Sequence, residues 1–174
     1  MLVLLCERDG ALEFPLTVRA TTVQTHKGQI SLPGGAREPG DRSFEETALR
    51  ETSEELGIQT KGVEILGALS RLFIPHSGFC VHPFVGFSKR QLRWRPDPAE
   101  VAQAFDAPLD RLLDPATVHE EVYLWDGQRF AVPAYHFGEH RVWGATAMIL
   151  AELVAILRGS TTLPGESDRQ EGEP

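Results

Sequence analysis

The residues best suited to chemistry are three glutamates in one short segment, Glu51, Glu54 and Glu55. Spacings of three and four residues put side chains on one helix face, so the three carboxylates would lie together. Crowded carboxylates supply the oxygen ligands that hard divalent cations prefer. The segment therefore suits a site for a hard divalent cation. A solvated acidic helix face has the same pattern, and Arg50 could pair with Glu46 or Glu54 one turn away.

The acidic segment belongs to the strongest helix candidate, residues 43–56. This segment opens on a serine with Glu46 three residues later, which is a capping-box pattern, and Gly57 supplies a stop. Just upstream, Gly34 and Gly35 allow a tight turn that could bring a backbone carbonyl to a metal ion. We therefore expect the glycine turn to lie beside the carboxylates of the helix.

Apolar, β-prone runs and turn signals elsewhere predict a sheet and a second long helix. Residues 98–113 look partly helical, with an interruption at Pro108. Strands and helices in this order favour an α+β domain, built as an α/β/α sandwich with a mixed sheet. The expected strands cover residues 2–6, 14–19, 63–73, 79–87, 121–125 and 129–135, and the second long helix covers residues 141–158.

The length of 174 residues predicts one domain with a tail. From residue 159 the composition shifts to Ser, Thr, Gly, Pro and charged residues. A segment of this kind buries too little apolar surface to fold. We expect one folded domain over residues 1–158 and a disordered tail over residues 159–174.

The charge balance narrows the function classes. With 25 acidic residues against 17 Lys and Arg, the formal net charge is −8, which argues against a protein that grips nucleic acid with its whole surface. No apolar run is long enough for a membrane span, and the N-terminal segment does not resemble a signal peptide. Cys6 and Cys80 have neither zinc-site nor disulfide spacing. A reduced, cytoplasmic protein is therefore expected.

The turn and the acidic helix together resemble the Nudix box, G-x5-E-x7-R-E-U-x-E-E-x-G-U. Two departures from the box are visible. Asp41 stands where the first Glu is expected, one residue further from the Arg than in the pattern, and Thr52 takes a usually bulkier apolar position. The Asp variant resembles the coenzyme A pyrophosphatase branch of the Nudix hydrolases. The matching residues are Gly35, Arg50, Glu51, Glu54, Glu55, Gly57 and Ile58.

A second motif, in residues 16–35, is similar to the signature of that branch, L-L-T-x-R-S-x3-R-x3-G-x3-F-P-G-G. Ala20 and Gln24 replace its Ser and second Arg, which removes a hydroxyl and a charge that could touch a nucleotide. Two later stretches, residues 77–86 and 142–147, also resemble the branch, so the resemblance spans nearly all of the expected domain. The matching residues of the signature are Leu16, Thr17, Arg19, Gly28, Pro33, Gly34 and Gly35.

The resemblance implies metal-dependent hydrolysis of the pyrophosphate bond of coenzyme A or its derivatives to 3′,5′-ADP and 4′-phosphopantetheine. Mg²⁺ or Mn²⁺ would neutralise the pyrophosphate oxygens and lower the pKa of a bound water. Glu51 and Glu55, as the i, i+4 pair, are expected to hold the metal with Glu54 and the Gly35 carbonyl. Arg50 is expected to orient a metal-binding glutamate.

A chain of net charge −8 needs local cations to bind a polyanion. Arg19 and Lys27 precede the glycine turn and are candidates for phosphate binding, with His26 beside them. Phe79 follows a probable loop and could stack on adenine or line the thiol arm, although a core position at a strand start is an equal alternative. The general base is left open among Glu54, Glu120 and Glu121.

Two other functions fit the same residues. The replacements at positions 20 and 24 are compatible with a different nucleoside diphosphate substrate, such as ADP-ribose, a dinucleotide or a damaged nucleotide. A non-catalytic nucleotide sensor is the other alternative, but all the box glutamates and Arg50 are present, which disfavours it. The expected partner is a small nucleotide. An uncovered sheet edge at residues 2–6 could pair with a second copy as a homodimer.

Overall fold

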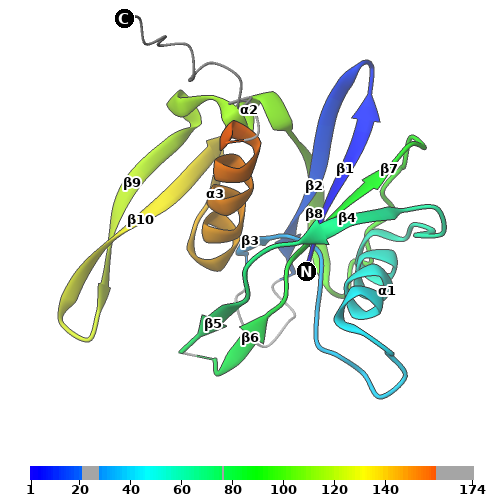
Figure 1. Ribbon diagram of the computed structural model, residues 1–174, viewed down its shortest axis with the longest axis horizontal. Helices are drawn as coiled ribbons and strands as arrows, with labels where there is room; N and C mark the ends of the chain where they lie inside the picture. The colour runs from blue at the N-terminus through cyan, green and yellow to red at the C-terminus, as the bar shows by residue number, and fades with distance from the viewer. Residues whose placement is uncertain (21–27, 76, 160–174) are drawn as a thin grey trace, which may run out of the picture.

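The computed structural model describes residues 1–20, 28–75 and 77–159. A six-stranded sheet forms its centre, with the order β3-β2-β1-β7-β4 and with β8 paired to β2 (Figure 1). β1 runs parallel to β7, and the other pairs are antiparallel, so the sheet is mixed as predicted. Its strands are β1 (Leu2–Arg8), β2 (Ala11–Arg19), β3 (Ile30–Ser31), β4 (Glu64–Ala68), β7 (Phe84–Ser88) and β8 (Val101–Pro108).

Two smaller sheets extend this centre. A three-stranded sheet has the order β11-β10-β9, and its β9–β10 hairpin projects to the left in Figure 1. The strands predicted over residues 121–125 and 129–135 are confirmed and form this hairpin, with longer bounds. A two-stranded sheet joins β5 and β6. These strands are β5 (Leu72–Ile74), β6 (Phe79–Val81), β9 (Val118–Trp125), β10 (Gln128–Phe137) and β11 (His140–Val142).

Two long helices, α1 (Phe44–Leu56) and α3 (Gly144–Gly159), cover opposite faces of the central sheet (Figure 1). The alternation of side chains along β1 explains this arrangement. Leu2 and Leu4 pack in the cluster that contains α1, whereas Val3 and Leu5 pack in the cluster that contains α3. The predicted α/β/α sandwich is thus confirmed. A short helix, α2 (Leu109–Leu113), and a 3₁₀ turn, η1 (Pro115–Thr117), precede β9.

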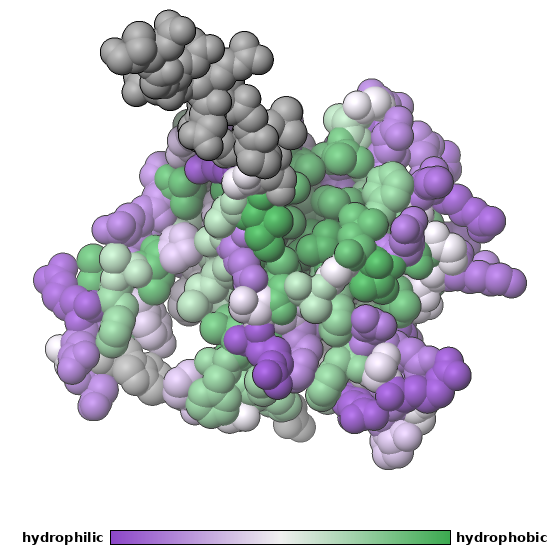
Figure 2. Space-filling model, in the orientation of Figure 1, coloured by the Kyte–Doolittle hydropathy of each residue, from purple (hydrophilic) through white to green (hydrophobic). Residues whose placement is uncertain are grey.

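Figure 2 shows hydrophobic side chains gathered over the middle of this face, whereas hydrophilic side chains prevail over the loop that leads into α1. Among the described residues, none of the helices has the length and apolar character needed to cross a membrane.

Both ends of α1 are where the sequence predicts them. The Ser43 hydroxyl accepts a hydrogen bond from the Glu46 backbone N–H at 3.2 Å. The Glu46 carboxylate, however, turns to the backbone and side chain of Arg42, so only half of the capping box forms. Gly57 ends the helix with a left-handed backbone, φ 60°. A Cβ on Gly57 would lie 2.3 Å from the backbone oxygen of Arg95, so this position requires glycine.

Four expectations need correction. The helical interpretation of residues 98–107 is wrong, because residues 101–108 form β8 and pair with β2 from Glu13 to Arg19. The last helix begins at Gly144, since the residues before it form β11. The runs 63–73 and 79–87 each break into two strands. β1 pairs on both sides, so it offers no free edge to a second copy. Of the predicted tail, Gly159 belongs to α3, and residues 160–174 lie outside the described residues.

The role of Gly57 gives a test of the fold. Gly57→Ala should destabilise the protein by about 2–4 kcal/mol, because the left-handed backbone and the close approach of Arg95 both oppose a side chain. Gly138 has a matching φ of 62° but open space around it, so Gly138→Ala should cost only about 1 kcal/mol. Urea unfolding of both variants measures the difference. Equal losses would show that the contact with Arg95 is unimportant.

Candidate active site

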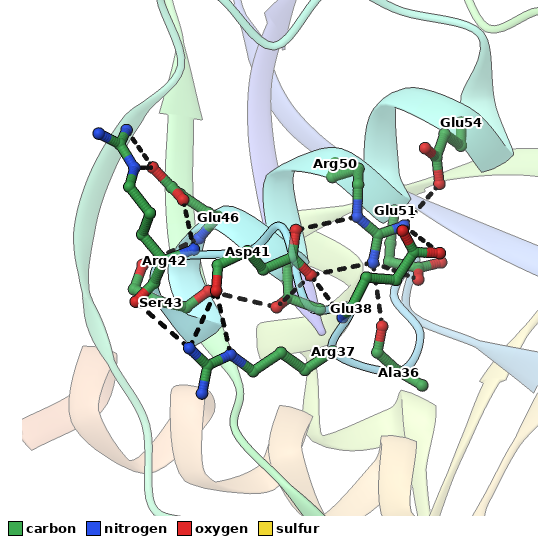
Figure 3. Close-up of polar contacts among 11 residues, drawn as sticks. Ala36, Arg37, Glu38, Asp41, Arg42, Ser43, Glu46, Arg50, Glu51 and Glu54 are labelled. Atoms are coloured by element: carbon green, nitrogen blue, oxygen red, sulfur yellow. Dashed lines mark hydrogen bonds and ion pairs between the residues drawn. The ribbon is translucent and has the colours of Figure 1, made fainter.

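The guanidinium of Arg50, in the middle of α1, is the hub of the acidic cluster (Figure 3). Its Nε and Nη2 donate to the two carboxylate oxygens of Asp41 at 3.0 and 3.1 Å. Nη1 donates to Glu54 at 2.8 Å, and Nη2 also donates to Glu51 and to the Ala36 carbonyl, both at 2.9 Å. One side chain therefore ties the loop before the helix to two glutamates of the predicted site.

Asp41 is built to hold this arginine. Its carboxylate is buried and also accepts hydrogen bonds from the Glu38 backbone N–H and the Thr47 hydroxyl, both at 2.9 Å. The hydrogen bonds from Arg50 hold the pKa of Asp41 well below its ordinary value. Asp41, the acid at the variant position of the box, therefore stays ionised and anchors Arg50.

Glu51 and Glu55 lie against the glycine turn. The Gly34 N–H donates to Glu55 Oε2 at 3.0 Å, and a Cβ on Gly35 would lie 2.3 Å from the carboxylate carbon of Glu51. Burial raises the pKa of Glu55 to about 7. Burial also raises the pKa of Glu51, against the opposing effect of Arg50. Both carboxylates are thus partly desolvated and lack full charge compensation.

Glu54 differs from these two, because its side chain is 58% exposed and pairs with Arg50. Among the described residues, no three His, Cys, Asp or Glu side chains converge closely enough to hold a metal ion by themselves. Mg²⁺ does not need such a cage, since one or two carboxylates with water and substrate phosphates are its usual protein site. Two partly desolvated carboxylates of α1 that lie against the glycine turn, with an exposed third one beside them, therefore fit a hard divalent cation.

A fourth acid, Glu100, was not predicted. Its charge contributes to the raised pKa of both Glu51 and Glu55, which places it near them. It lies in the turn before β8, where its carbonyl accepts a hydrogen bond from the Ala20 N–H at 2.8 Å. The sequence offers no spacing signal for Glu100, because the pairing of β8 with β2 brings it to the site.

The predicted substrate-binding residues have different outcomes. Arg19, at the end of β2, lowers the pKa of Glu55 by its charge, and its buried Nε has no acceptor among the described residues. His26 and Lys27 lie outside the described residues. Phe79 is 62% exposed at the start of β6, which rules out the core position that was its alternative.

The two other candidates for the base lie on β9. Glu120 is exposed. Glu121 accepts a hydrogen bond from Arg141 Nε at 2.8 Å, and this pairing lowers the pKa of Glu121. No hydrogen bond or ion pair between described residues joins Phe79, Glu120 or Glu121 to the carboxylates of α1. The structure therefore groups Arg50, Arg19 and the α1 glutamates, but not these three.

The raised pKa of Glu55 predicts how the stability of the metal-free protein depends on pH. Unfolding returns Glu55 to an ordinary pKa of 4.5, so the unfolded chain holds fewer protons between about pH 4.5 and 7. The free energy of unfolding should therefore fall as pH rises through this window and stay level above it. Glu55→Gln should abolish this loss, making the variant more stable by on the order of 3 kcal/mol at pH 8.

Urea unfolding with a chelator at pH 5 and pH 8 measures this difference. Glu54→Gln is the matched control, since the same change is made one residue away on an exposed side chain. Parallel pH profiles of the wild-type protein and the Glu55→Gln variant would contradict the desolvation of Glu55.

Sequence and structure comparisons relate the chain to known proteins. The sequence model of the NUDIX domain matches residues 1–126. Over 138 residues the chain is 38% identical to a protein of Photorhabdus laumondii named uncharacterized Nudix hydrolase NudL, covering 79% of this chain and 73% of that protein. Over 167 residues it is 33% identical to the human mitochondrial coenzyme A diphosphatase NUDT8, covering 94% and 71%.

A solved structure supports the same architecture. The Nudix hydrolase RenU of M. smegmatis superposes with a TM-score of 0.58 over 97% of this chain and 87% of that one, at 18% identity. At this identity the likeness concerns the fold alone.

Proposed function

The chain belongs to the Nudix family of pyrophosphate hydrolases, and from this premise we propose that it cleaves coenzyme A or its derivatives to 3′,5′-ADP and 4′-phosphopantetheine. The observation that carries the proposal is the Asp41–Arg50 pair. It gives the Asp variant of the box a structural role, since both carboxylate oxygens of the displaced acid accept hydrogen bonds from the Nε and Nη2 edge of the arginine. The similarity to a human coenzyme A diphosphatase supports the same substrate.

Nudix hydrolases generally use divalent metal ions such as Mg²⁺ or Mn²⁺. Such an ion would neutralise the pyrophosphate oxygens and lower the pKa of a water nucleophile. We assign Glu51, Glu55 and the Gly35 carbonyl to hold it, with Glu54 beside them. Arg50 is a positioning residue, because it touches Glu51 and Glu54 and fixes both carboxylates against the turn.

Glu100 adds a further carboxylate whose charge acts on the proposed metal-binding pair, and we include it as a candidate ligand or base. The other candidates for the base remain Glu54, Glu120 and Glu121. Of these, Glu54 and Glu121 are each paired with an arginine, and the pairing with Arg141 lowers the pKa of Glu121.

We assign Arg19 to the substrate pyrophosphate, because its buried Nε has no acceptor among the described residues and a phosphate oxygen would supply one. His26, Lys27 and Phe79 remain substrate-binding proposals that rest on the sequence. A cytoplasmic location also belongs to this proposal. Cys6 and Cys80 are both free, which suits a reducing compartment.

The test of the proposed function is a product assay. The protein is incubated with Mg²⁺ or Mn²⁺ and, separately, coenzyme A, ADP-ribose, NADH and 8-oxo-dGTP, with products resolved by mass spectrometry. We expect 3′,5′-ADP and 4′-phosphopantetheine to form fastest, and Glu55→Gln to lower that rate at least about 100-fold while the fold is kept.

Each other outcome has a definite meaning. A faster reaction with another substrate would show that Ala20 and Gln24 have redirected the specificity within the same chemistry. Nucleotide binding without cleavage would favour the sensor. Wild-type rates in Glu55→Gln would contradict the metal assignment.

The anchoring of Arg50 generates a separate prediction. Asp41→Asn keeps the shape of the side chain but removes the charge that fixes Arg50, so the metal-dependent rate should fall about 10–100-fold and more metal should be needed for half-maximal activity. Glu38→Gln is the control, because it also removes one acid near Arg50. The Glu38 side chain is 65% exposed, and its contact with Arg50 is long, at 3.9 Å. A titration of the rate against Mg²⁺ measures both variants. Similar losses in both would mean that general acidity of the loop, and not the Asp41–Arg50 pair, is what matters.

A further inference from the structure

A cavity of about 340 Å³ opens between the central sheet and the β10–β11 turn, away from α1. Val18, Ile30 and Gln103 line one side, and His140, Arg141 and Trp143 line the other. This volume lies in the range of small-molecule sites, and a flat indole beside amide and imidazole groups suits an aromatic ring with polar edges. The cavity therefore has the composition of a site for a heteroaromatic ligand.

Arg141 carries the permanent positive charge of this cavity. The described residues that line the cavity include no Lys and no second Arg, and their one acidic residue is Glu139. The Arg141 guanidinium lies over the Trp143 ring, 5.3 Å from the ring centre. In a chain of net charge −8, an anionic group in this cavity would depend on Arg141.

Glu121 fixes the position of Arg141. Its carboxylate accepts from Arg141 Nε at 2.8 Å and pairs with Nη2 through its other oxygen. His136 lies 3.8 Å from the same carboxylate. This leaves Nη1 without a hydrogen-bond partner among the described residues. A guanidinium that is held on one edge and free on the other loses little conformational entropy when it binds an anion.

The cavity and the carboxylate site meet at the end of β2. Val18 lines the cavity, while the charge of the next residue, Arg19, acts on Glu55. Neighbouring residues of a strand point to opposite faces. The last residues of β2 therefore border both sites, and a ligand around this end of the strand could reach from one to the other.

We propose that Arg141, held in place by Glu121 over Trp143, recognises a phosphate monoester on the nucleotide end of the substrate. This inference rests on the proposed function, because a 3′-phosphorylated adenosine is the part of coenzyme A that combines an aromatic base with such a group. Arginine suits the role, since its planar donors match phosphate oxygens. Glu121 is then a positioning residue that acts through Arg141.

The experiment measures binding in the absence of metal, so it does not depend on catalysis. Calorimetry compares the affinities of the metal-free protein for 3′,5′-ADP and for 5′-AMP, which lacks the second phosphate. The wild-type protein should prefer 3′,5′-ADP by about tenfold or more, as a charge-assisted hydrogen bond predicts. Arg141→Gln should bring this ratio close to one, and Arg141→Lys should keep part of it.

Three further variants separate positioning from charge and from folding. Glu121→Gln should lower the ratio but keep it above that of Arg141→Gln, because Arg141 remains but is less fixed. Trp143→Leu should weaken both ligands and also lower the ratio, because it removes the ring beneath Arg141. Arg129→Gln is the matched control, since it removes an exposed arginine from β10 outside the cavity lining. It should keep the wild-type ratio, and the unfolding temperature of each variant checks the fold.

Equal wild-type affinities for the two ligands, no binding of either one, or an unchanged ratio in Arg141→Gln would overturn the inference. Failure of the proposed function looks different. If the protein discriminates the two ligands through Arg141 but does not hydrolyse coenzyme A, the proposed substrate is wrong and the phosphate site stands. A coenzyme A hydrolase with no discrimination would refute this site alone.

Discussion

The pairing of Arg50 with the acids around it is the interaction on which the site depends. Acids at three- and four-residue spacings on one helix face repel one another, and here two of them are also withdrawn from water. Arg50 places one positive charge among these acids, and Asp41 fixes it through two hydrogen bonds from Nε and Nη2 to its two carboxylate oxygens. The loop from Ala36 to Asp41 is held to α1 by the same side chain, so the shape of the turn and the charge of the helix are set together.

The central sheet separates two kinds of chemistry. The α1 face carries the carboxylates, and the opposite side carries the cavity beside Trp143, with β2 bordering both. Each side uses the same device, an arginine held by an acid: Arg50 by Asp41 and Arg141 by Glu121. The outcomes differ because their surroundings differ. Arg50 is surrounded by acceptors and therefore organises other side chains, whereas Arg141 keeps one free edge for a ligand.

Local patterns were enough to predict part of this molecule. The limits of α1, the turn at Gly35 and the grouping of Arg50 with its glutamates depend on contacts within a few turns of chain, and the sequence displays them. β8 and Glu100 could not be found in this way. The segment around residues 101–107 is rich in alanine, and only the distant partner β2 makes it a strand. Glu121 was similarly visible as an acid but not as the partner of Arg141, which a different strand supplies.

Burial of Glu55 lowers the stability of the folded protein near neutral pH, and binding of a cation would restore it. A carboxylate whose pKa rises to about 7 on folding opposes folding near neutral pH, and the Gly34 N–H offsets only part of that cost. A divalent cation would remove the remaining cost, because it favours the ionised form that burial disfavours. Ligand binding and folding are then linked, and the folded state gains stability as the cation binds. Glu54 is 58% exposed, so burial distinguishes two adjacent glutamates that we propose as metal ligands.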